Sequence, residues 1–170
     1  MRGRILLKDL GLYIHIPFCS SKCYYCDFVS FPNLNNKIDE YIDYLIKELK
    51  DYEELLKEYS IKTIFIGGGT PSYIGERYIA KILEHIYKSF KTDKIEEITI
   101  EANPGTITKD KLKLYKEYGI NRLSIGVQSL NDKLLNSIGR IHTSMDFYRN
   151  FKLMRKLGFK SINVDLMFGL

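Results

Sequence analysis

The chain has 170 residues, a formal net charge of +5 at pH 7, and 45% hydrophobic and 28% charged residues. This length suffices for one domain with a hydrophobic core, and the composition is typical of a folded globular protein. The sequence holds no run near the ~18 apolar residues of a membrane span. It also holds no basic run interleaved with aromatic residues, so nothing favours a nucleic-acid partner.

The first residues, MRGRILLKDLGLY, are basic, but Lys8 and Asp9 interrupt their apolar run. This pattern makes a poor signal peptide, so we expect a cytoplasmic protein. Thiols stay reduced in that compartment, where a close group of cysteines indicates metal binding more often than a disulfide.

Strands and helices are predicted to alternate along the chain, from β-branched and aromatic runs and from apolar spacings of three or four. In order, the pattern predicts strand 11–16, helix 36–59, strand 61–66, helix 76–89, strand 95–101, helix 109–118, strand 122–128, short helix 132–137, helix 145–157 and strand 161–168. Thr108 is the expected N-cap of the helix at 109–118, and Gly158 is expected to end the last helix.

Repeated strand–helix units predict an α/β fold with a parallel sheet and right-handed crossovers. Five such units could form an open doubly wound sheet or part of a βα barrel, and periodicity does not separate the two. The chain ends at Leu170, directly after the last predicted strand and without a helix to cover it. We therefore expect residues 1–170 to form one incomplete domain.

The carboxyl end of every predicted strand carries unusual residues. They are the cysteine loop after Pro17, GGGTPS at 67–72, EANPG with Glu101, GVQS with Gln128, and Asp165. Taken singly, such residues also serve as tight turns or helix caps. Because ligands of parallel α/β proteins bind at the carboxyl ends of the strands, the full set indicates one shared site.

All three cysteines, Cys19, Cys23 and Cys26, lie within eight consecutive residues with the spacing C-x3-C-x2-C. A structural zinc site usually has four ligands, and His15 reaches this loop awkwardly from within a strand. A redox pair of Cys23 and Cys26 leaves Cys19 without a role. The spacing favours an iron–sulfur cluster, with zinc and redox chemistry as alternatives. Three thiolates would leave one iron of a four-iron cluster open to a small ligand.

The cysteine loop, with Tyr25 before its last cysteine, resembles that of the radical S-adenosylmethionine (SAM) superfamily. The ordered segments YIHIPFC, GGGTPS, IEANPG, SIGVQS, IGRIH and NVDLMFGL are similar to its coproporphyrinogen III oxidase-like branch, over about the first half of such proteins. The resemblance implies a partial (βα)6-type barrel of about five units. It also implies a [4Fe–4S] cluster on the three cysteines, with SAM on the open iron as the source of a 5′-deoxyadenosyl radical.

The resemblance further implies roles for single residues. Tyr13, Gly68 and Glu101 match positions that contact the cluster-bound SAM. Positions that line a second cofactor site in the oxidase are matched by Tyr25, Gly69, Thr70, Gln128, Arg140 and Asp165. We interpret His15 as a satisfied strand histidine, with a supporting role behind the cofactor contacts as the alternative, and assign no role to His142.

Two departures from the oxidase pattern favour the HemW-like heme chaperones of this branch. Phe28 stands where the oxidase carries a further cysteine, and Tyr13 lies very near the start of the chain. Their expected heme-binding motif belongs to a later half that this sequence does not include. Expected partners are SAM, heme or porphyrinogen, an electron donor and a heme acceptor. The alternatives are oxidative decarboxylation of coproporphyrinogen III, a zinc or thiol α/β domain, and a truncated chain without function.

Overall fold

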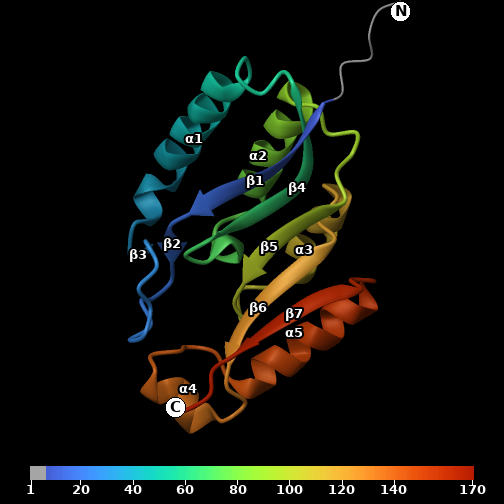
Figure 1. The fold of residues 1–170 in the computed structure, drawn as a ribbon. Coiled ribbons are helices and arrows are strands. Elements are labelled where there is room, and N and C mark those ends of the chain that lie inside the picture. The colour runs from blue at the N-terminus through green and yellow to red at the C-terminus, as the bar shows by residue number, and fades with distance from the viewer. Residues whose placement is uncertain (1–6) are drawn as a thin grey trace, which may run out of the picture.

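The structure, a computed structural model, describes residues 7–170. The basic start of the chain, on which the prediction against a signal peptide partly depends, lies outside the described residues. The chain forms a curved five-stranded sheet with its long helices along one side (Figure 1). Among residues 7–170, no helix is both long and apolar enough to cross a membrane.

The main sheet contains β1 (Lys8–Ile16), β4 (Tyr59–Gly68), β5 (Glu97–Ala102), β6 (Arg122–Gln128) and β7 (Ser161–Leu166). The helices are α1 (Ile38–Tyr52), α2 (Glu76–Ser89), α3 (Lys109–Glu117), α4 (Asp132–Ser137) and α5 (Ser144–Lys156), with short 3-10 turns η1 (Asn35–Lys37) and η2 (Pro71–Tyr73). Two short strands, β2 (Phe18–Cys19) and β3 (Phe31–Pro32), pair with each other inside the cysteine loop.

All neighbouring strands are parallel, and their order in the sheet, β1-β4-β5-β6-β7, follows the chain. A doubly wound sheet would reverse this order at a switch point. Right-handed crossovers between strands in chain order place α1, α2, α3 and α5 on the same face, as Figure 1 shows. The prediction of parallel α/β repeats is therefore confirmed, and the strand order favours an arc of a barrel.

The two faces of the sheet differ in chemistry. Ile66, Ile100 and Leu123 are neighbours in register, and all three are buried on the helix side. One residue further along the strands, Glu101 and Ser124 are neighbours on the opposite, concave face. Because side chains alternate along a strand, the apolar row forms the core and leaves polar groups inside the arc.

The largest error among the predicted boundaries is at the end of the first helix. The helix predicted over 36–59 ends at Tyr52, and β4 begins at Tyr59. The backbone N–H of Lys8 donates to Glu58 O at 2.9 Å, and Tyr59 pairs with Lys8 in β1. Tyr59 therefore belongs to a strand, because it pairs with β1, although its spacing in the sequence also suits a helix. The strands β2 and β3 were not predicted, because two residues carry no periodicity.

Both predicted helix boundaries at α3 and α5 are confirmed. The side chain of Thr108 accepts a hydrogen bond from the backbone N–H of Lys111 at 3.2 Å. Gly158, at a φ of 82°, follows the end of α5, and the Phe159 N–H donates back to Met154 O at 3.1 Å. This backbone conformation is accessible to glycine at little cost, which is why the helix ends there.

Tyr115 of α3 offers a test of the core. Its side chain is fully buried, and its hydroxyl has no hydrogen-bond partner among the described residues. An unpaired buried hydroxyl costs about 1–3 kcal/mol, so Tyr115→Phe should raise the free energy of unfolding by about 1 kcal/mol in urea denaturation. Tyr41→Phe is the matched control and should lower it, because the Tyr41 hydroxyl donates to His15 O at 2.8 Å. A destabilised Tyr115→Phe variant would mean that the hydroxyl is paired.

Candidate functional site

The cysteine loop, residues 17–32, lies along the carboxyl edge of the sheet and is attached to the loops on both sides (Figure 1). On one side the Thr70 N–H, after β4, donates to Phe18 O at 2.8 Å. On the other side the Tyr24 N–H donates to Ile138 O, after α4, at 3.1 Å. The loop therefore connects the first and later units of the sheet.

These loops enclose an open cavity of about 140 Å³. All predicted site residues except Tyr13 line it, namely Cys19, Cys23, Tyr25, Cys26, Gly68, Gly69, Thr70, Glu101, Gln128, Arg140 and Asp165. Sequence reasoning did not select Ser21, Lys22, Phe28, Ser30, Ala102, Asn103, Ser124 and Gly126, which line the same cavity. The structure thus brings the carboxyl ends of all five main strands to one place.

Each cysteine sulfur lies near one polar group of the cavity wall. The contacts are Cys19 Sγ to Thr70 Oγ1 at 3.5 Å, Cys23 Sγ to Arg140 Nη1 at 3.5 Å, and Cys26 Sγ to Ser30 Oγ at 3.9 Å. Within residues 7–170, no three His, Cys, Asp or Glu side chains converge on a point that would suit one metal ion. A [4Fe–4S] cluster does not require such convergence, because each thiolate binds a different iron.

Gly68 connects the glycine loop to the carboxylate at the end of β5. Its φ of 114° suits glycine, and its N–H donates to Glu101 Oε2 at 3.0 Å. A Cβ at this position would lie 2.7 Å from the His15 ring. Any other residue at position 68 would therefore disturb both the backbone and its neighbours.

Glu101 is the main acceptor on the cavity wall. Burial raises its pKa and the nearby Asp165 carboxylate adds to the rise, whereas the Gly68 N–H and His15 oppose it. A carboxylate can accept several hydrogen bonds, so Glu101 keeps acceptor capacity for an ammonium or hydroxyl group of a ligand.

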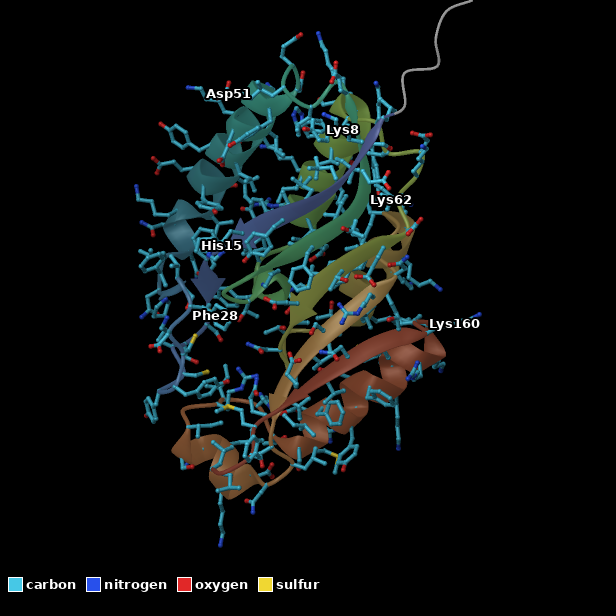
Figure 2. The ribbon with its side chains drawn as sticks, viewed as in Figure 1. Lys8, His15, Phe28, Asp51, Lys62 and Lys160 are labelled. Atoms are coloured by element: carbon cyan, nitrogen blue, oxygen red, sulfur yellow. The ribbon has the colours of Figure 1, made fainter. Side chains whose placement is uncertain are left out.

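Tyr13 lies on β1 outside the lined cavity. Its hydroxyl is 2.9 Å from His15 Nδ1, and His15 Nε2 is 2.8 Å from Val29 O. Because a carbonyl only accepts, Nε2 carries the proton, and Nδ1 accepts from the Tyr13 hydroxyl. His15 therefore anchors the returning end of the cysteine loop to β1, which supports its interpretation as a satisfied strand histidine. Figure 2 labels His15 at the end of β1 and Phe28 in the cysteine loop that follows this strand.

Arg140 joins three segments of the site. Its Nη2 donates to Asn103 Oδ1 at 2.8 Å and also to Gly126 O, while Nη1 faces Cys23. A Cβ on Gly126 would lie 3.0 Å from both Arg140 Nη2 and Asn103 Oδ1, so the glycine leaves room for this contact. Burial, followed by Cys23, raises the pKa of Tyr25 to about 12, against the opposing charge of Arg140.

The ends of β6 and β7 complete the wall. Gln128 has a φ of 66° at an irregularity of the β6–β7 pairing, a strained conformation for a residue other than glycine. Asp165 Oδ1 accepts from Asn163 Nδ2 at 2.7 Å, and Oδ2 accepts from Ser124 Oγ at 3.4 Å. These bonds hold the Asp165 carboxylate on the concave face.

The two-residue alternation of side chains along a strand could have identified two of the missed cavity residues, Asn103 and Gly126. Asn103 lies two residues after Glu101, and Gly126 lies two residues before Gln128, so alternation places each pair on one face. No periodic signal identifies Lys22, whose Nζ donates to Phe28 O at 2.6 Å and closes the cysteine loop.

His142 lies behind Arg140, and its Nε2 is 3.3 Å from Val127 O. Burial, together with the charge of Arg140, lowers its pKa to about 4, against the opposing effects of the Val127 carbonyl and of Asp146 and Asp132. Between about pH 6.5 and pH 4, His142 is therefore protonated in the unfolded chain but neutral in the folded protein. The free energy of unfolding should therefore fall as the pH is lowered from about 6.5 to 4.

Comparing thermal unfolding of the wild type and His142→Gln at pH 5 and pH 7.5 tests this dependence. The variant should lose less stability at pH 5, because the carboxylates common to both proteins cancel in the difference. Equal losses in the two proteins would contradict a neutral buried His142.

The sequence matches the radical SAM superfamily over residues 13–170, and the chain belongs to that superfamily. It is 43% identical over 159 residues to the heme chaperone HemW of Bacillus subtilis (strain 168), covering 93% of this chain and 42% of that protein. It is 42% identical to HemW of Escherichia coli (strain K12), covering 98% of this chain and 44% of that protein. The chain therefore spans less than half the length of these relatives.

Among solved structures, coproporphyrinogen III oxidase (HemN) from Escherichia coli superposes with a TM-score of 0.89 at 30% identity. The match covers 99% of this chain and 39% of that one. It confirms the predicted fold class.

Superfamily membership implies a [4Fe–4S] cluster and SAM. The residues present fit such a group. The three free cysteines can supply thiolates, which are soft ligands that iron–sulfur clusters prefer, and each sulfur has a polar neighbour.

Proposed function

We propose that this chain binds a [4Fe–4S] cluster through Cys19, Cys23 and Cys26 and holds SAM at the remaining iron. The observation that carries the proposal is the single cavity onto which all three cysteines open, beside Gly68 and Glu101. When bound, the cluster and SAM supply one-electron chemistry, while the protein orients them and limits access of water.

The wall residues have separate proposed tasks. Gly68 lets the methionyl amino group approach the backbone closely, and Glu101 accepts hydrogen bonds from SAM. Tyr13 lies outside the lined cavity. We propose that it acts on the SAM site indirectly, because its hydroxyl contacts His15, which in turn bonds to the cysteine loop at Val29 O. A facing wall for a second cofactor would be formed by Tyr25, Gly69, Thr70, Gln128, Arg140 and Asp165. We propose that residues 1–170 constitute the first part of a radical SAM core domain.

For the whole protein we propose a cytoplasmic heme chaperone that passes heme to an acceptor protein, with a separate electron donor for the cluster. The proposal is supported by the relatives named heme chaperone HemW at 42% and 43% identity. It is also supported by Phe28, which occupies the position of a further cysteine in the oxidase and lines the cavity beside Cys26.

A second candidate function is oxidative decarboxylation of coproporphyrinogen III. It is favoured by the likeness to the HemN structure, and by the position of all six residues that match the oxidase's second cofactor site on one cavity. Under this alternative the protein is an enzyme.

Electron paramagnetic resonance of the anaerobically reconstituted and reduced chain tests the site. We expect a four-iron signal that changes on addition of SAM, because SAM would chelate the open iron. Absence of a cluster, or a signal indifferent to SAM, would overturn the proposed site.

Two further assays, on this chain and on the chain extended to the length of its relatives, separate the two functions. Stoichiometric heme binding without turnover of coproporphyrinogen III supports the chaperone. Anaerobic turnover with reductant and SAM supports the oxidase.

A further inference from the structure

A continuous series of hydrogen-bonding groups connects the sulfurs of Cys19 and Cys23 through three side chains. Cys19 Sγ lies 3.5 Å from Thr70 Oγ1, which lies 2.9 Å from Asn103 Nδ2. The other end of the same amide, Asn103 Oδ1, is 2.8 Å from Arg140 Nη2, and Arg140 Nη1 is 3.5 Å from Cys23 Sγ. Asn103 is the central member, and no role has been assigned to it above.

The directions of the bonds in this series follow from the groups at its ends, because Arg140 can only donate and an iron-binding cysteine thiolate can only accept. The guanidinium of Arg140 has no acceptor, so the Asn103 oxygen must face it. The amide nitrogen of Asn103 then faces Thr70 and donates to its hydroxyl oxygen. Toward a Cys19 thiolate, which has no proton to give, the Thr70 hydroxyl is then the donor. Both sulfurs therefore receive a donor, one from Thr70 and one from Arg140.

The backbone around Asn103 holds this arrangement in place. Its carbonyl accepts from the Thr106 N–H at 3.1 Å and from Thr106 Oγ1 at 2.7 Å. Its N–H donates to Ser72 Oγ at 3.3 Å, and Pro104 follows it directly. Asn103 is thus fixed on both sides before its side chain contacts the cavity.

Donors to the cluster's sulfurs change its redox balance in a known direction. Reduction adds negative charge, and hydrogen bonds to the ligand sulfurs stabilise that charge and raise the potential. Removing such a donor should make the cluster harder to reduce. Asn103 contacts neither sulfur, so its effect would be exerted through Thr70 and Arg140.

We propose that Asn103 is a positioning residue that aims the Thr70 hydroxyl at Cys19 and the Arg140 guanidinium at Cys23, and thereby raises the reduction potential of the cluster. The inference rests on the proposed function, because it requires a cluster on these cysteines. It goes beyond that function by assigning the control of the potential to a side chain that contacts no cofactor ligand.

The test is a redox titration of the reconstituted full chain, followed by electron paramagnetic resonance without SAM. Asn103→Ala removes both of its directed bonds, whereas Thr70→Val removes the donor to Cys19 and the acceptor of Asn103 Nδ2 but leaves the contact of Arg140 with Cys23. Each variant should show about a tenfold lower reduced-to-oxidised ratio at a fixed potential, which is about 59 mV for one electron. The double variant should shift by less than the sum of the single shifts, because both act through Cys19.

Asn121→Ala is the matched control. Asn121 also makes two side-chain bonds, from the Ile98 N–H at 2.9 Å and to Glu96 O at 2.8 Å, but at the amino end of β6. It should alter stability without moving the potential. Unchanged potentials in Asn103→Ala, at full iron and sulfide content, would overturn the inference alone. A wild-type chain that takes up no cluster would overturn the proposed function and the inference with it.

Discussion

Replacing Cys19 with serine is expected to abolish uptake of the iron–sulfur cluster. The chain has only three cysteines, so no other thiolate can take the place of Cys19. A serine hydroxyl stays protonated near neutral pH and is a poor ligand for iron. The change is small in volume and should cost only about 1 kcal/mol of folding stability. Iron and acid-labile sulfide per chain, measured after anaerobic reconstitution, would fall to the background of protein kept without iron.

The adjacent change Ser20→Ala serves as the control for this experiment. It alters the same loop without removing a sulfur, and should leave the cluster content unchanged. If Cys19→Ser retained a full complement of iron and sulfide, two cysteines and another group would have to suffice. The proposed ligand set would then be wrong.

Replacing Gly69 with alanine is expected to disrupt the packing of the glycine loop against the cysteine loop. The added Cβ would lie 2.8 Å from Phe18 O, 2.9 Å from the Pro17 carbonyl carbon and 3.0 Å from Cys19 Sγ. Two of these atoms belong to the backbone and cannot rotate away. We expect the free energy of unfolding to fall by about 3 kcal/mol, with reduced cluster uptake, because the cysteine loop must move.

Gly75→Ala provides the comparison for this effect. A Cβ there would meet the Tyr78 ring at 3.7 Å, which is ordinary van der Waals contact. Urea denaturation should place this variant within about 1 kcal/mol of the wild type. Equal stability of the two alanine variants would show that the glycine loop can separate from the cysteine loop without cost.

The sheet could be predicted from the sequence because its strands are apolar runs between clear helical stretches. The strand at 122–128 lies where it was predicted, and so does the helix at 76–89. The end of the first helix could not be predicted from the sequence. Tyr59 fits the apolar spacing of a helix, but in the structure it belongs to β4 and pairs with Lys8 of β1. That choice depends on a partner strand that lies far away in the sequence.

The cavity was predicted in outline for a related reason. Parallel strands bring their carboxyl ends to one edge, so Glu101 and Asp165 were expected near the cysteines. The series centred on Asn103 could not be predicted, because it depends on which way an amide and a guanidinium turn. The position of Tyr13 outside the lined cavity likewise depends on its bond to His15, which spacing does not reveal.

The attachment of the cysteine loop to the segment after α4 has a consequence for biosynthesis. Cys23 and Arg140 are 117 residues apart in the chain, and Tyr24 is paired with Ile138. A ribosome that has just released the cysteine loop has yet to make both partners. The cysteines of a nascent chain are therefore synthesised long before Ile138 and Arg140, the residues that hold their loop in place. For the proposed cluster ligands, we therefore expect the cysteine loop to reach its final position only after the segment that follows α4 has been translated.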